Sequence, residues 1–171
     1  MTKLFNFFSN CLIGSVAVLL MFSSCGMPSG EVYVSDIEEL NVLKPGWKEM
    51  IRDLSVDGNS LIIGEKWYSK GLGVHANSEI SFQTPKGYTH FVAEVGIDDE
   101  IPEENPASVI FIVEGDGAVL YESPILKADM PPRRIHVNVE GISELKLIVD
   151  EADNGTNSDH ADWGNARLVK R

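Results

Sequence analysis

The chain has 171 residues, a length typical of one domain with a single hydrophobic core. It carries 26 acidic and 14 basic side chains, and its formal net charge is −12. Binding to phosphate backbones depends on clustered Lys and Arg, and the nearest such cluster is Arg133-Arg134, so we exclude nucleic acid as a partner. The acidic surface would also repel anionic headgroups, so we expect membrane attachment only through a lipid.

Residues 1–24 are typical of an export signal. A basic N-terminus precedes an apolar stretch from Cys11 to Phe22, and its roughly 12 residues are too few for the ~20 that span a bilayer as a helix. The small residues before Cys25 resemble a bacterial lipobox, which implies that Cys25 is lipidated and that residues 25–31 form a polar tether. An ordinary signal peptide or an uncleaved anchor is the alternative. Each interpretation places the protein outside the cytoplasm, in the bacterial cell envelope.

Residues 32–171 are expected to form one β-rich domain. Several runs alternate apolar and polar residues at period two, which is typical of half-buried strands, and the run from Tyr88 to Val95 is the clearest. The run from Ser108 to Glu114 is apolar on both faces, as a central strand would be. Five further strands are predicted at 79–82, 118–122, 134–140, 145–149 and 165–169, and short helices are indicated at 37–43 and 47–54.

Many short strands separated by Gly, Pro and Asn predict an all-β fold, an antiparallel two-sheet β-sandwich. The order of strands along the chain leaves jelly-roll and immunoglobulin-like topologies open. Cys11 would be removed and Cys25 lipidated, so the mature domain would have no disulfide. Its stability would then depend on the core or on a bound metal, which keeps Ca²⁺ as a candidate cofactor.

Six phrases resemble one known family. They stand in the order found in NPCBM domains, a group of carbohydrate-binding modules, and the resemblance extends from Val32 to Leu168. It implies a galactose-binding-like jelly roll, often with a structural calcium ion, that binds galactose-containing or related glycans. It also implies a glycoside hydrolase as partner, because these modules usually accompany such enzymes. The phrases are Val34-Ser-Asp36, Gly46-Trp47, Asp53 to Gly58, Lys70 to Ala76, Val95 to Glu100 and Asp159 to Trp163.

The chemistry of sugar recognition suggests roles for these residues. A sugar offers a weakly apolar C–H face, which an indole can cover, and hydroxyl groups, which carboxylates and imidazoles can bind at its edge. Trp163 has acidic and histidine neighbours of this kind, and His75 lies on a glycine-rich strand that another backbone can approach closely. The predicted carbohydrate-binding residues are His75, Asp98, Asp99, Glu100, His160, Asp162 and Trp163.

Structural roles are the alternative for several of these residues. Trp163 could be a core ring, and His75 could be a buried histidine bonded to Asp99 or to the backbone. The acidic run from Asp98 to Glu100 has three interpretations, as sugar acceptors, as ligands of a hard cation or as a solvated loop.

A calcium site is predicted at a second position. Asp57-Gly58-Asn59 resembles the Asp-Gly turn that contributes to calcium binding in many galactose-binding-like domains, and Asn165 would complete the set. An ordinary tight turn is the alternative for this segment.

No catalytic motif supports an enzyme. Nucleophile elbows, P-loops, paired-cysteine zinc motifs and zincin helices are all absent from the sequence. Glycosidases need only two suitably spaced carboxylates, so hydrolase activity is kept as a minor alternative. The second alternative is an adaptor lipoprotein whose sandwich domain binds a protein partner.

Overall fold

The computed structural model describes residues 30–152 and 155–170. The predicted signal peptide 1–24, the lipidation site Cys25 and most of the predicted tether lie outside these residues. In the part of the chain that is described, no helix has the length and apolar character needed to cross a membrane.

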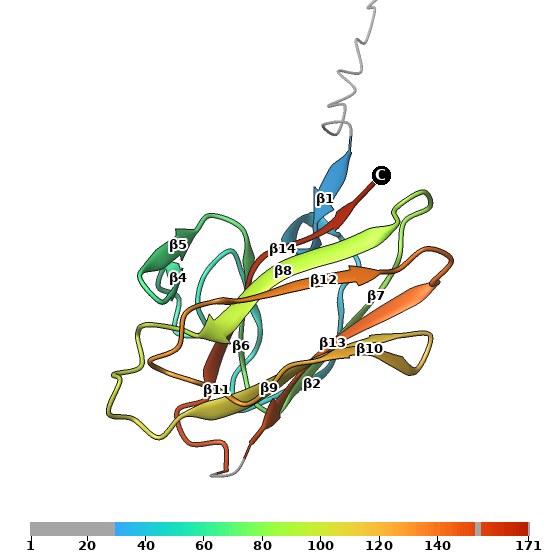
Figure 1. Cartoon of the computed structure of the whole chain (residues 1–171). Coiled ribbons are helices and arrows are strands. Elements are labelled where there is room, and N and C mark those ends of the chain that lie inside the picture. The colour runs from blue at the N-terminus through green and yellow to red at the C-terminus, as the bar shows by residue number, and fades with distance from the viewer. Residues whose placement is uncertain (1–29, 153–154, 171) are drawn as a thin grey trace, which may run out of the picture.

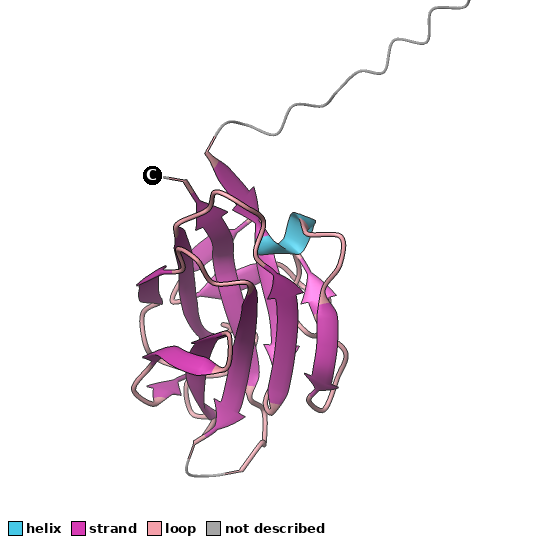
Figure 2. Cartoon of the chain, turned by 90° about the vertical axis from the view of Figure 1, so that its right-hand side faces the viewer, coloured by secondary structure: helices cyan, strands magenta, loops and turns pink. Residues whose placement is uncertain are grey.

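Nearly all of the regular structure in the described residues is strand, and the one exception is a single 3₁₀ turn, η1 (Val34–Asp36) (Figure 2). The strands are β1 (Glu31–Tyr33), β2 (Asn41–Pro45), β3 (Ile51–Arg52), β4 (Leu61–Ile63), β5 (Lys66–Tyr68), β6 (Gly71–His75), β7 (Ser78–Gln83), β8 (His90–Ile97), β9 (Ser108–Gly115), β10 (Ala118–Glu122), β11 (Leu126–Lys127), β12 (Arg133–Asn138), β13 (Glu144–Glu151) and β14 (His160–Val169).

Two antiparallel sheets form a sandwich (Figure 1). The first has the order β12-β8-β14-β6-β3, with β1 paired to the end of β14, and the second has the order β10-β9-β13-β7-β2, with β11 paired to β9. The predicted two-sheet β-sandwich is therefore confirmed. The interior position of β9 also matches the run that is apolar on both faces.

The two segments that indicated helix contain short strands and loops instead. Residues 37–43 lead into β2, which pairs with β7, and residues 47–54 contain β3, which pairs with β6. The helix prediction is wrong here because pairing at the edge of each sheet satisfies these backbones and overrides a weak local propensity.

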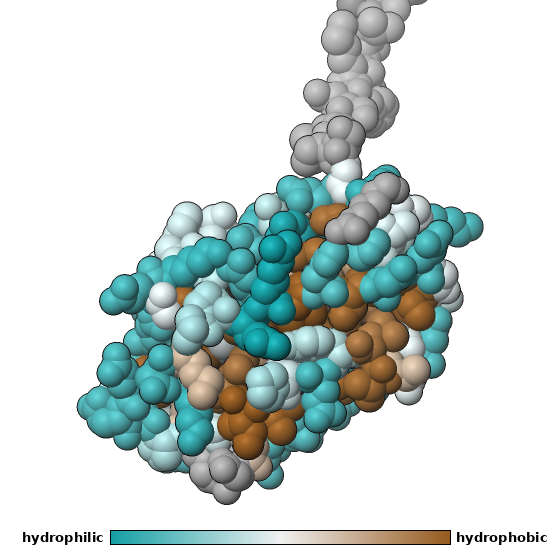
Figure 3. Space-filling model, in the orientation of Figure 1, coloured by the Kyte–Doolittle hydropathy of each residue, from teal (hydrophilic) through white to brown (hydrophobic). Residues whose placement is uncertain are grey.

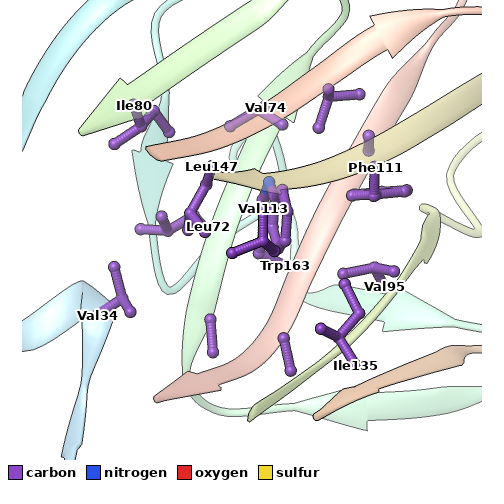
Figure 4. Packing of buried hydrophobic residues seen from close by; sticks show 14 of the residues in the cluster. Val34, Leu72, Val74, Ile80, Val95, Phe111, Val113, Ile135, Leu147 and Trp163 are labelled. Carbon is purple, nitrogen blue, oxygen red and sulfur yellow. The ribbon is translucent and has the colours of Figure 1, made fainter. Parts of the chain in front are cut away.

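The core between the sheets centres on Trp163, the largest fully buried side chain (Figure 4). Its ring lies edge-on to Phe111 at 5.0 Å between centroids and to Phe91 at 6.3 Å. Edge-to-face contacts of this kind add to the stabilisation from apolar burial. Along β14, Ala161 and Trp163 point inward, so Asp162 between them points to the outer face of the first sheet.

The β4–β5 hairpin covers part of that outer face. Its buried side chains Leu61, Ile63 and Tyr68 form a second, smaller hydrophobic cluster. Glycines in the sheet beneath make room for them, because a Cβ at Gly96 would lie 2.4 Å from Ile63 and one at Gly164 would lie 2.9 Å from the Tyr68 ring. The glycines of the sheet thus serve to seat this hairpin on the sheet.

Hydrophobic residues on the face shown in Figure 3 lie in several patches interrupted by hydrophilic residues. Among the described residues, Trp47 and Trp67 are the most exposed of the large hydrophobic side chains, at 69% and 61%. Trp47 lines a hollow of the surface.

Candidate functional site

A surface hollow of about 580 Å³ lies at the start of β14. Its lining combines one indole, two imidazoles and a short polar loop. The lining residues are Trp47, His75, Thr156, Asn157, Ser158 and His160. An aromatic ring beside several hydrogen-bonding groups is the composition expected of a site for a small polar ligand.

Trp47 is held at the hollow by the residue before it. Gly46 has φ +78°, and a Cβ there would lie 2.1 Å from the carbonyl oxygen of His75, so no other residue fits against this backbone. The close approach places the Trp47 ring 5.5 Å from the His75 ring. The Gly46-Trp47 phrase therefore builds one wall of the hollow, and the indole stays exposed to ligand.

His75 ends β6 and is buried except where it reaches the hollow. Its Nδ1 lies 2.6 Å from the carbonyl oxygen of Ala76, and because a carbonyl can only accept, Nδ1 carries the hydrogen. Burial lowers the pKa of His75, although the bond to Ala76 opposes this change. The ring is therefore neutral near pH 7, and its Nε2 is a hydrogen-bond acceptor. Of the two alternatives for a buried His75, the backbone partner is correct.

His160 begins β14 directly opposite His75 in the sheet register. The two rings lie 5.4 Å apart. Nδ1 of His160 is 2.7 Å from Oε1 of Glu100, so it donates to this carboxylate and leaves Nε2 as the second ring nitrogen. Two imidazoles from neighbouring strands are thus fixed side by side in defined orientations.

Glu100 lies behind His160 and is held from its other side. Its Oε2 accepts hydrogen bonds from the Ser55 hydroxyl and from the Asn59 side-chain amide, both at 2.8 Å. Its backbone N–H donates to the Asp98 carboxylate at 2.8 Å. Glu100 was predicted as a direct sugar ligand, and the structure places it where it positions His160.

Asp98 and Asp162 form a buried carboxyl pair beneath the β4–β5 hairpin. Asp162 has no exposed surface, and burial raises its pKa well above its usual range. Burial also raises the pKa of Asp98, which accepts hydrogen bonds from the backbone N–H groups of Ile62 and Glu100. The neighbouring Asp98 carboxyl group adds to this rise in the pKa of Asp162, and both oxygens of Asp162 are buried without a hydrogen-bond partner among the described residues. Neither of these predicted sugar ligands reaches the hollow.

Asp99 and Trp163 are also placed away from the hollow. The Asp99 carboxylate accepts from the backbone N–H groups of Gly64 and Glu65, both at 2.7 Å, and lines a different depression of the surface. The prediction that Trp163 contacts sugar is wrong, because its indole is fully buried in the core. Trp47 supplies the exposed indole instead, and the only sequence signal for it is its place in one of the six phrases.

The predicted calcium ligands do not converge. Asp57 and Asn59 lie near Glu100, whereas the backbone N–H of Asn165 donates to Lys70 at the opposite end of β6. Asn165 lies five positions after His160 in β14, which corresponds to about 16 Å along a strand. Asn165 therefore cannot share an ion with Asp57.

The profile of the NPCBM/NEW2 domain family matches residues 30–169. The chain belongs to this family. The match covers the whole sandwich, so every element that lines the hollow is part of the NPCBM/NEW2 domain. The family that the six phrases resemble is thus confirmed.

Three known proteins illustrate what this NPCBM/NEW2 domain is similar to. An alpha-1,3-galactosidase B of Akkermansia muciniphila is 34% identical over 115 residues, which cover 65% of this chain and 14% of that protein. The structure of CBM51-2 and INT domains of Clostridium perfringens ZmpB with GlcNAc has 35% identity and a TM-score of 0.75, covering 82% of this chain and 31% of that one. The CBM51 of Clostridium perfringens GH95 with methyl-galactose has 31% identity and a TM-score of 0.73, covering 81% and 99%.

The chain spans only 10% and 14% of the length of the curated relatives that it matches. The similarity therefore concerns one module of much longer proteins. Both solved structures are carbohydrate-binding modules with a bound monosaccharide. They confirm the sandwich fold for this NPCBM/NEW2 domain.

Proposed function

We propose that this domain is a non-catalytic carbohydrate-binding module that binds a galactose-type residue, or a related hexosamine, in the hollow beside Trp47. The observation that carries the proposal is the 69% exposed indole of Trp47 next to His75 and His160. Methyl-galactose and GlcNAc are the ligands in the two solved relatives, which supports this class of sugar.

The hollow matches the two surfaces of a sugar ring. The C–H face would stack on Trp47, as apolar surface does on an indole. Hydroxyl groups at the ring edge would donate to Nε2 of His75 and of His160, because the hydrogens of both rings are already directed to other partners. The polar loop from Thr156 to Ser158 offers further hydrogen-bonding groups on the same lining.

The state of the nearby carboxylates favours binding over hydrolysis. Glu100 is engaged by three side chains, and the Asp57 carboxylate forms an ion pair with Lys48. A glycosidase needs a general acid and a second carboxylate facing the scissile bond. The Glu100 and Asp57 carboxylates are bound by other side chains of the domain and so do not suit the role of general acid. We propose that a separate glycoside hydrolase is the partner.

The arrangement of β14 suits display from a membrane. The strand begins at His160 in the hollow and ends at Val169, which pairs with Glu31 in β1 near the N-terminal side (Figure 1). The hollow and the N-terminal strand therefore lie about 30 Å apart, at opposite ends of the sandwich. We propose that lipid on Cys25 anchors the protein in the cell envelope with the hollow facing away from the membrane.

A glycan array with the purified protein tests the proposal. We expect selective binding to glycans that contain galactose or a hexosamine, and at least a tenfold loss of affinity in Trp47→Ala. Trp67→Ala is the matched control, since its indole is 61% exposed on β5 outside the hollow. Equal binding by the two variants, or silence of a folded protein on the array, would contradict the proposal and favour a protein partner.

A further inference from the structure

His160 lines the hollow, and two carboxylates, those of Asp57 and Glu100, lie close to its ring. Nδ1 of His160 lies 2.7 Å from Oε1 of Glu100 and 4.0 Å from Oδ2 of Asp57. One possible ligand atom from each of the three side chains lies within 4.8 Å of those of the other two. They come from three separated segments of the chain, so the tertiary structure assembles the group.

Each of these side chains is held in place by a partner outside the group. The other oxygen of Glu100 accepts from Ser55 and Asn59, and the other oxygen of Asp57 accepts from the Lys48 ammonium group. His160 is only 8% exposed and begins a paired strand. One oxygen of each carboxylate and one imidazole nitrogen therefore stay directed inward, while the remaining oxygens are bound by other residues.

We propose that Asp57, Glu100 and His160 bind a divalent transition-metal ion of the zinc type. Zinc accepts imidazole nitrogen and carboxylate oxygen together, and two carboxylates balance its charge. Calcium takes six to eight oxygen ligands, and three ligand atoms that include a nitrogen do not suit it. This site differs from the predicted calcium set of Asp57, Asn59 and Asn165.

The observed distances are close to those of a tetrahedral zinc site. Ligand bonds of about 2.1 Å at tetrahedral angles separate neighbouring ligand atoms by about 3.4 Å. To reach that separation from Nδ1, the Glu100 oxygen would move outward by about 0.7 Å and the Asp57 oxygen inward by about 0.6 Å. On binding the ion, Nδ1 of His160 would carry no hydrogen and Nε2 would carry the ring hydrogen, and the fourth position is left for water.

Titration of the metal-free protein with zinc chloride in a calorimeter tests the site. We expect one zinc ion per chain, loss of this binding in His160→Gln, and an affinity about tenfold or more lower in Asp57→Asn. His136→Gln is the matched control, because His136 stacks on His90 at 4.9 Å on the paired strands β8 and β12 and could itself attract zinc.

The outcomes separate cleanly. Zinc binding that disappears in His160→Gln and persists in His136→Gln supports the site. Zinc binding that persists in His160→Gln, or no heat of binding at millimolar zinc by a folded protein, overturns it. The circular dichroism of each variant establishes that it is folded. The titration contains no sugar. A negative result would therefore rule out the metal site and would not affect the proposed sugar binding, which the glycan array tests.

Discussion

Oε1 of Glu100 accepts a hydrogen bond from Nδ1 of His160 at 2.7 Å, across 60 residues of sequence. The bond fixes both the tautomer of the imidazole and the direction of its ring. Since the same carboxylate is anchored by Ser55 and Asn59, these two side chains help to orient His160 through Glu100.

Glu100→Ala is expected to weaken sugar binding by about tenfold, because His160 would lose its oriented acceptor, a change of about 1.4 kcal/mol. Glu100→Gln should restore most of the affinity, since an amide oxygen can still accept from Nδ1. Calorimetry with methyl-galactoside in a chelating buffer measures both values. Equal losses in the two variants would mean that Glu100 acts by charge or by direct contact and not by positioning.

Substitution of the core tryptophan Trp163 should reduce stability, whereas substitution of Trp47 in the hollow should leave stability nearly unchanged. Trp163→Ala is expected to lower the free energy of unfolding by about 3–5 kcal/mol, because it removes a ring that is fully buried against Phe91 and Phe111. Trp47→Ala should change it by no more than about 0.5 kcal/mol, as expected for an exposed residue. Urea unfolding measures the free energy of unfolding of both variants. A loss in Trp47→Ala as large as that in Trp163→Ala would show that Trp47 stabilises the fold.

The buried carboxyl group of Asp159 should make the folded protein less stable as the pH rises. Its side chain has no exposed surface and accepts a hydrogen bond from the Ser108 N–H at 2.9 Å, and burial raises its pKa to about 6. The folded protein therefore holds this proton more tightly than the unfolded chain does. Stability from this group is fully present below about pH 4 and is lost as the pH rises through 6.

Asp159→Asn removes this pH dependence. The free energy of unfolding of the variant minus that of the wild type should therefore be about 2–3 kcal/mol larger at pH 7.5 than at pH 4. Urea unfolding at both pH values, with chelator present, measures the difference. The comparison isolates Asp159, because the buried pair Asp98 and Asp162 titrates in both proteins. A constant difference between the proteins would show that Asp159 stays ionised in the fold.

Much of the architecture could be predicted from the amino-acid sequence. Alternation at period two located the strand at β8, the apolar run located the central strand β9, and the ordered phrases identified the family. These properties are local, since side-chain direction alternates along any strand and turn residues mark its ends. His75 and His160 were also located in this way, because unusual polar residues interrupt otherwise ordinary strands.

Only the tertiary structure decided which tryptophan faces solvent. Trp163 and Trp47 both stand in family phrases, but β14 is buried between two neighbours while Trp47 lies beyond an edge strand. The sequence also did not show which carboxyl groups are buried. Asp98, Asp162 and Glu100 carry the same chemical group, and they differ in whether the β4–β5 hairpin covers them. Sequence determines the period and chemistry of each strand, whereas burial depends on contacts between distant segments that no local pattern contains.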